Sequence, residues 1–191
     1  MRKGGLASLA FFYFDSRDDK KKDRRNLLSS LLFQFYDQSD SYYKIFSDFY
    51  STHRRGSHYP SDAALTQCLK DMLTCPGQAP IYIIVDGVDE CPKSSGRLFP
   101  RDKVLMLVKE LVGLRLPNLH ICMTSRPEVD IETIIHPLTS HSISLHDEKG
   151  QIQDIVDYIT SIVNSDLGMR RWRVEDKELV IDILSQKADG M

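Results

Sequence analysis

Several features that mark specialised classes of protein are missing from the sequence. Neither sign of charge is in excess, since 25 basic and 27 acidic residues leave a formal net charge of −2. A balanced charge gives no reason to expect nucleic acid or an anionic membrane as a partner. None of the four cysteines forms a Cys-x-x-Cys pair, and the six histidines do not complete a zinc pattern. We therefore expect reduced thiols, mostly buried, in a cytoplasmic protein.

A long hydrophobic run is also missing. The stretch Leu6–Phe14 follows a basic start, as the core of a signal peptide would. It is far shorter than the ~20 residues that a membrane helix needs. No small-x-small cleavage site follows it, because the chain continues directly into the charged segment that begins at Asp15. We expect no membrane span, and the aromatic residues of the run favour a buried strand.

The segments that are present alternate between two kinds of pattern. Apolar runs rich in β-branched residues indicate strands, and they are typical of parallel strands that are covered on both faces. Segments with apolar residues at a period of 3.6 indicate amphipathic helices. Strand–helix alternation of this kind predicts an α/β fold with a parallel sheet flanked by helices. The expected strands are Leu9–Phe14, Ile81–Val85, Leu119–Thr124 and Ser142–Leu145, and the expected helices start at Asn26 or cover Tyr42–Tyr50, Ser61–Met72, Arg101–Leu116, Val129–Ile135, Gly150–Asn164 and Asp176–Lys187.

Three carboxylates follow the strand expected at Ile81–Val85. Asp86 comes directly after the strand, and Asp89 and Glu90 follow shortly after it. Ligands of open parallel sheets bind at the carboxyl ends of the strands, and Mg²⁺ binds through one or two carboxylates together with phosphate oxygens and water. We therefore expect Asp86 to face a metal ion, and Asp89 or Glu90 to orient or deprotonate a water. The alternative is that these acids only cap the turn that follows.

Two further residues near these strand ends suit a phosphate ligand. Gly87 has no side chain, so the backbone can turn tightly there or let a phosphate approach. Ser125 and Arg126 follow the strand expected at Leu119–Thr124. A guanidinium in this place can reach a terminal phosphate and neutralise charge in phosphoryl transfer. The alternative for Arg126 is a salt bridge to one of the acids, but its pairing with the acidic strand end favours a phosphate-sensing role.

At these two strand ends the chain resembles the NACHT family, within the larger STAND group of signal-transducing ATPases. Ile83–Glu90 resembles the Walker B strand of that family, with the small residue Gly87 after the metal aspartate. Thr124–Pro127 resembles the end of its sensor 1 strand, and Phe11–Asp15 resembles its second strand. Lys187–Met191 resembles the start of a motif at the end of a helix. The match is closest to large fungal proteins in which ankyrin or similar repeats follow the NACHT domain.

The resemblance implies a function for each matched residue. Asp86 would hold Mg²⁺ through water, Asp89 with Glu90 would direct the attacking water, and Arg126 with Ser125 would sense the γ-phosphate. The fold implied is P-loop NTPase-like, of the AAA+/STAND kind. ATP binding and slow hydrolysis would change the packing of domains and drive homo-oligomerisation.

The resemblance also implies a domain organisation. Residues 1–150 would form a partial nucleotide-binding core, and residues 151–191 would begin the C-terminal helical region. Winged-helix and repeat domains of a longer chain would then be the partners of this segment. Neither nucleic acid nor a membrane is expected as a partner.

One part of the family pattern has no counterpart in the sequence. The first strand and the phosphate-binding loop Gly-x-x-x-x-Gly-Lys-Ser/Thr should precede Leu9, but only eight residues do so, and Gly5 is not followed by Lys-Ser. That loop supplies the amides and the lysine that hold the phosphates. We therefore expect a segment truncated at both ends, with the first strand missing from its sheet, that binds Mg-ATP weakly or not at all by itself.

Two other functions are open. A degenerate domain without the phosphate loop would be a non-catalytic protein-interaction module, which affinity for ATP would distinguish from a NACHT ATPase. A Mg²⁺-dependent phosphohydrolase would use the acidic strand end directly. That enzyme class would want an acid at the position of Val88, together with a later lysine and an acidic pair, and the sequence offers no clear set of these residues.

Overall fold

The computed structural model describes residues 5–53, 59–93, 100–144 and 149–188. Contacts between residues divide the chain into two compact units, residues 1–139 and residues 140–191, and each is described by itself. The predicted assignment of residues 1–150 to a nucleotide-binding core stays a prediction. The last three residues of the predicted motif Lys187–Met191 lie outside the described residues.

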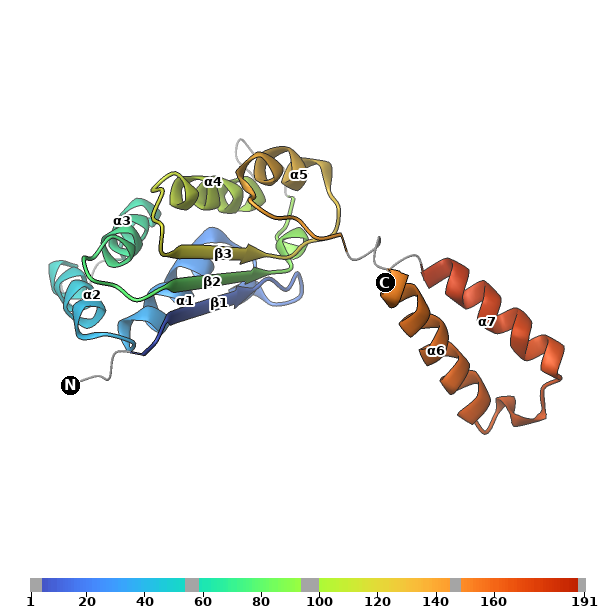
Figure 1. Cartoon of the computed structure of the whole chain (residues 1–191). Coiled ribbons are helices and arrows are strands. Elements are labelled where there is room, and N and C mark those ends of the chain that lie inside the picture. The colour runs from blue at the N-terminus through green and yellow to red at the C-terminus, as the bar shows by residue number, and fades with distance from the viewer. Residues whose placement is uncertain (1–4, 54–58, 94–99, 145–148, 189–191) are drawn as a thin grey trace. The chain divides into compact units, whose positions relative to one another are not determined.

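The order of the elements is that of an α/β protein, as the sequence predicts. Strands are separated by helices throughout the first unit, and short 3₁₀ turns (η) connect several of them (Figure 1). The elements are β1 (Ser8–Tyr13), η1 (Asp19–Lys21), α1 (Arg24–Tyr36), α2 (Asp40–Thr52), α3 (Asp62–Leu73), β2 (Ile81–Asp86), η3 (Val88–Glu90), α4 (Pro100–Val112), β3 (Leu119–Met123), α5 (Val129–Ile135), η4 (His136–Leu138), α6 (Lys149–Ser165), η6 (Met169–Arg171) and α7 (Val174–Ala188).

The three strands form one parallel sheet in the order β1-β2-β3. The register pairs Tyr13 with Asp86 and Val85 with Met123, so the carboxyl ends of all three strands finish at the same level. Helices α1 to α3 connect β1 to β2, and α4 connects β2 to β3. The sheet therefore presents the segments after Tyr13, Asp86 and Met123 side by side at one edge.

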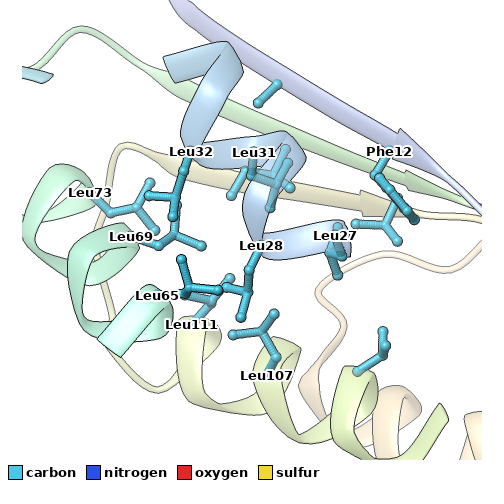
Figure 2. Packing of buried hydrophobic residues seen from close by; sticks show 14 of the residues in the cluster. Phe12, Leu27, Leu28, Leu31, Leu32, Leu65, Leu69, Leu73, Leu107 and Leu111 are labelled. Atoms are coloured by element: carbon cyan, nitrogen blue, oxygen red, sulfur yellow. The ribbon is translucent and has the colours of Figure 1, made fainter. Parts of the chain in front are cut away.

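A single hydrophobic core lies between the sheet and the helices α1, α3 and α4. The inward residues of the strands, such as Phe12 and Ile83, are buried together with the apolar stripes of those helices. Leucines from the three helices point toward one another in this core, with Phe12 of β1 beside them (Figure 2). Side-chain caps begin α1, α2 and α3. Ser61 accepts the Ala64 N–H as the N-cap of α3, which confirms the predicted helix start.

The opposite face of the sheet is largely bare in the described residues, which differs from the expectation of strands covered on both faces. Along β1 and β2, buried and exposed residues alternate strictly. A continuous apolar strand cannot by itself say whether a second layer is present, because both arrangements need the same residue types. The exposed apolar residues of this face, called the bare face below, are Leu9, Phe11, Tyr13, Tyr82 and Ile84.

The second unit consists of α6 and α7, which lie side by side as a helical hairpin (Figure 1). Val163 of α6 is buried, whereas Tyr158, Leu179 and Leu184 are exposed. The strand predicted at Ser142–Leu145 is wrong for the residues described, because residues 141–144 have no regular structure and Leu145 lies outside the description. Ile143 is exposed there, so the alternation in sequence does not correspond to a buried face. Within the described residues, no helix has the length and apolar character that crossing a bilayer requires.

Candidate functional site at the strand ends

Thr124 joins the carboxyl ends of β2 and β3. Its hydroxyl donates a hydrogen bond to Oδ1 of Asp86 and accepts one from the Gly87 N–H at 3.0 Å. Its carbonyl oxygen accepts the Val88 N–H at 3.1 Å. The predicted metal-side carboxylate of Asp86 is therefore exposed but held in one orientation by its neighbouring strand.

Gly87 adopts the left-handed backbone conformation, with φ 66° and ψ 43°. A Cβ added there would meet the Phe14 carbonyl oxygen at 3.5 Å and Cγ of Glu90 at 3.6 Å, which are ordinary contacts. The requirement for glycine thus comes from the backbone, because L-residues disfavour this region. The predicted tight turn at Gly87 is confirmed. It directs η3, which carries Asp89 and Glu90, back across the strand ends.

The structure brings together two of the predicted site residues, Asp89 and Arg126. The Asp89 carboxylate accepts the Arg126 N–H at 3.0 Å, and its Oδ2 lies 3.5 Å from Nε of the Arg126 side chain. Only 10% of the Asp89 side chain is exposed, against 80% for Arg126. The salt bridge that the sequence left open as an alternative is thus present, while the guanidinium still reaches solvent. Ser125, beside it in the chain, is exposed as well.

Glu90 points toward the end of β1. Its carboxylate accepts the Ser16 N–H at 3.3 Å. Hydrogen bonding from Ser16 lowers the pKa of Glu90 below its usual value, so this side chain is an anion at neutral pH. A lowered pKa makes a carboxylate a poorer general base. The lowered pKa therefore counts against Glu90 as a general base.

A buried arginine, Arg101, bonds to both loops of this site. Only 3% of Arg101 is exposed, and its guanidinium donates to the carbonyl oxygens of Asp89 and Cys91, the latter at 3.0 Å. The same group donates to Glu128 at 2.8 Å and to Asp130 at 3.2 Å, at the start of α5. Arg101 thus fastens the turn after β2 to the segment after β3, which fixes the relative placement of Asp89 and of the chain that carries Arg126.

Lys93 adds a second positive charge to the acids at the start of α5. It forms ion pairs with Glu128 and, at 3.0 Å, with Asp130. The pKa of Glu128 is lowered by Lys93 and then by Arg101. Burial acts to raise the pKa of Asp130, but the hydrogen bond from Lys93, a backbone hydrogen bond and the positive charge of Arg101 together lower it. A surface hollow of about 640 Å³ adjoins these ion pairs, and it is lined by Lys93, Pro127, Glu128, Val129, Asp130, Thr133 and Ile134.

The acids at the strand ends do not form a metal cage by themselves. Among the described residues, no group of three or more His, Cys, Asp or Glu side chains converges as metal ligands would. Mg²⁺, however, is usually bound by one or two carboxylates and completes its shell with water and substrate phosphates. The exposed, oriented carboxylate of Asp86 fits that mode.

Three residues of this site were missed by reasoning from the sequence: Ser16, Arg101 and Thr124. Thr124 was placed at a strand end, and a hydroxyl opposite an aspartate on the next strand is a signal that could have singled it out. Arg101 sits in the first turn of a helix, where a positive charge is unfavourable unless an acid is near. That mismatch was the available signal for a buried partner. Ser16 follows β1 in a charged loop with no pattern that would single it out, although its backbone N–H and its side chain both bond to the Glu90 carboxylate.

Comparison with known proteins adds one family. The family model described as nephrocystin 3, N-terminal, matches residues 2–126, which is about two thirds of the chain and includes both strand ends. The matching model is not that of the NACHT family, which the motifs resemble. No curated protein and no solved structure matches the chain.

Proposed function

The chain belongs to the nephrocystin 3 N-terminal family, and from that premise we propose that it is part of a NACHT-type signal-transducing NTPase. In this proposal the longer cytoplasmic protein is a switch that ATP controls and that assembles into homo-oligomers. The observation that carries the proposal is the placement of Asp86 and of the Asp89–Arg126 ion pair at adjacent carboxyl ends of a parallel sheet. Ligands of such sheets bind at this edge.

Each residue has a distinct role in the proposed switch. Asp86, oriented by Thr124, would hold Mg²⁺ through water. The bound ion would neutralise negative charge on the phosphates. Asp89 would orient the attacking water, and Arg126 with Ser125 would sense the γ-phosphate. Arg126 pairs with Asp89, so contact of the guanidinium with a phosphate would compete with this ion pair and couple sensing to the catalytic carboxylate.

Nucleotide binding in this proposal requires a phosphate-binding loop from elsewhere in a longer chain. Two observations support further segments as partners. The bare face exposes five large apolar residues. At the outer edge of β3, the N–H groups of Ile121 and Met123 have no partner in the described part of the chain. Winged-helix and repeat domains, as in the NACHT proteins that the motifs resemble, are the proposed neighbours of the helical hairpin.

Calorimetric titration with Mg-ATP tests the proposal. The complete protein should bind Mg-ATP, Asp86→Asn should weaken the binding that depends on Mg²⁺, and Arg126→Ala should reduce the preference for ATP over ADP. The present chain by itself should bind weakly or not at all. A micromolar Kd for this chain alone, equivalent to about −8 kcal/mol, would overturn the requirement for a phosphate loop.

A non-catalytic protein-interaction module is the second candidate. It is favoured by the pairing of Asp89 with Arg126, which gives the nearly buried Asp89 carboxylate both a hydrogen bond and an ion pair within the chain. Under this function the bare face would bind a protein partner, and the complete protein would show no affinity for Mg-ATP. The same titration therefore separates the two candidates. Magnesium-dependent phosphatase activity without nucleotide preference would instead favour the phosphohydrolase.

A further inference from the structure

The outer edge of β1 is closed by side chains rather than by another strand. The even-numbered residues of β1 turn their backbone groups toward β2, since the Ser8 N–H donates to Pro80 and the Phe14 N–H donates to Asp86. The odd-numbered residues, beginning with Leu9 and Phe11, turn theirs away from the sheet. Unpaired N–H and C=O groups of this kind are a template for another strand.

Two glutamines of α1 satisfy the groups of Leu9 and Phe11. Gln38 accepts the Leu9 N–H at 2.8 Å and donates to the Leu9 carbonyl at 2.6 Å. Gln34 accepts the Phe11 N–H at 3.0 Å and donates to the Phe11 carbonyl at 2.7 Å. Each carboxamide thus presents one acceptor and one donor to a single residue, which is what a neighbouring strand would present. We call this pair the glutamine clamp.

The spacing of the clamp follows from the geometry of the two elements. Residues four apart on a helix are separated by about 6 Å along its axis. Residues two apart on a strand are separated by about 6.6 Å. Gln34 and Gln38 therefore match Phe11 and Leu9 when helix and strand run in opposite directions.

The amides of the clamp are held in place before they meet the strand. The second N–H of Gln34 donates to Ser30 at 2.9 Å, and that of Gln38 donates to the Gln34 carbonyl at 2.9 Å. The two carboxamides are therefore not free to turn away into solvent. A side chain ordered in advance loses less entropy when it binds the edge of the strand.

The outer edge of β3 differs from that of β1. The backbone groups of Asn118 and Thr124 bond to β2. The backbone groups of the odd-numbered residues between them therefore point away from the sheet. Leu119 donates to Leu116 at 3.2 Å. For the N–H groups of Ile121 and Met123, no partner occurs within the described part of the chain. Only one edge of the sheet thus carries a clamp.

We propose that Gln34 and Gln38 act as a surrogate strand that closes β1 against strand addition by a second copy of this chain. The segment that they protect has the composition of a self-associating strand, since Leu9–Phe14 is apolar, aromatic and uncharged. The clamp makes β1 the terminal strand of the sheet and leaves β3 as the edge at which a further strand can be added.

Residue-resolved amide exchange of the full chain tests the clamp. In the double variant Gln34→Ala and Gln38→Ala, the amides of Leu9 and Phe11 should exchange on the order of tenfold faster, because each loses its acceptor. The amides of Ala10 and Phe12, which face β2, should keep their protection. Light scattering should then show concentration-dependent association beyond that of the parent chain. Unchanged exchange at Leu9 and Phe11, or faster exchange without association, would overturn the proposal.

A control removes two glutamines that are more exposed than those of the clamp and that bond within their own helices. Gln67 and Gln153 each donate only to an aspartate one turn further along the same helix. Their double alanine variant should change neither exchange nor association, and association equal to that of the clamp variant would contradict the proposal. If the alanine clamp variant fails to fold, Gln34→Asn with Gln38→Asn keeps the amides but shortens their reach. It should show the same gain in exchange and association.

Discussion

At the scale of single residues, Thr124 is the side chain on which the geometry of the strand ends depends. Valine in its place keeps the shape but removes the hydroxyl that Asp86 and the Gly87 N–H both use. Thr124→Val should lower the free energy of unfolding by about 1–3 kcal/mol, measured by urea denaturation. Thr124→Ser keeps the hydroxyl and should retain most of the parent chain's free energy of unfolding. Thr133→Val, at an exposed helix position, is the control with a small expected effect. Equal losses in both valine variants would contradict the role of Thr124.

The acids at the start of α5 give a prediction for pH. The pKa of Glu128 in the folded chain lies below its ordinary value of 4.5, because Lys93 and Arg101 stabilise the carboxylate. A lowered folded pKa contributes stability above pH 4.5, and this contribution is lost as the pH falls through the folded pKa. The urea midpoint of the parent chain should therefore exceed that of Glu128→Gln at pH 7, and the difference should shrink as the pH falls through the folded pKa of Glu128, which lies below 4.5.

The control for this pH effect is Glu132→Gln, which alters an exposed acid of the same helix. Its midpoint should follow that of the parent chain at both pH values. A difference between the parent chain and Glu128→Gln that is the same at pH 7 and at low pH would show that the ion pairs at Glu128 contribute nothing.

At the scale of elements, the sheet has one buried face and one exposed face, and neighbouring residues of β2 test this. Ile83 is buried on the covered face, whereas Ile84 is 38% exposed on the bare face. Ile83→Ala should cost about 2–5 kcal/mol, and Ile84→Ala about 1 kcal/mol or less. Chemical denaturation of the two variants measures the contrast. Similar costs would mean that a layer covers the bare face in solution.

The sequence predicts most of the elements of this fold but not their surroundings. Val129–Ile135 is a helix with the predicted bounds, and β2 extends the predicted strand by one residue, Asp86. The local sequence patterns of these segments are strong, and packing against other elements does not change their secondary structure. Whether Tyr82 and Ile84 are covered depends on what packs above them, which composition does not encode. The strand predicted at Ser142–Leu145 was wrong for a related reason, since alternation makes a strand only where a partner strand is available.

The candidate site shows the same limit. Asp86, Asp89 and Arg126 could be selected because residue type and position after a strand identify them. The contacts that hold them come from Thr124 and Arg101, and from the strand register that sets the two loops side by side. Register and burial arise only in the folded chain. Their contribution therefore became visible only in the structure.

At the scale of the molecule, cysteine accessibility reports whether the first unit folds as described. Burial raises the pKa of Cys68 and of Cys91 to about 12, so their reactive thiolate is scarce at pH 8. Cys122 is exposed on β3 and Cys75 is half-buried. A thiol reagent should label Cys122 first, then Cys75, and the two buried cysteines only after unfolding. Mass spectrometry of the labelled peptides measures the order, and rapid labelling of all four would contradict the core.

The first unit carries an acidic strand end and Arg126, which is proposed to sense phosphate, and the phosphate-binding loop that they would work with is proposed to come from elsewhere in a longer chain. The family match covers both strand ends but says nothing about ATP. Sequencing of the transcript upstream of the Met1 codon tests this dependence most directly. An in-frame Gly-x-x-x-x-Gly-Lys-Ser/Thr within a few tens of residues is the predicted result, and it would make Asp86, Asp89 and Arg126 the residues to mutate. A genuine start at Met1 without such a loop would contradict the ATP switch and favour the interaction module.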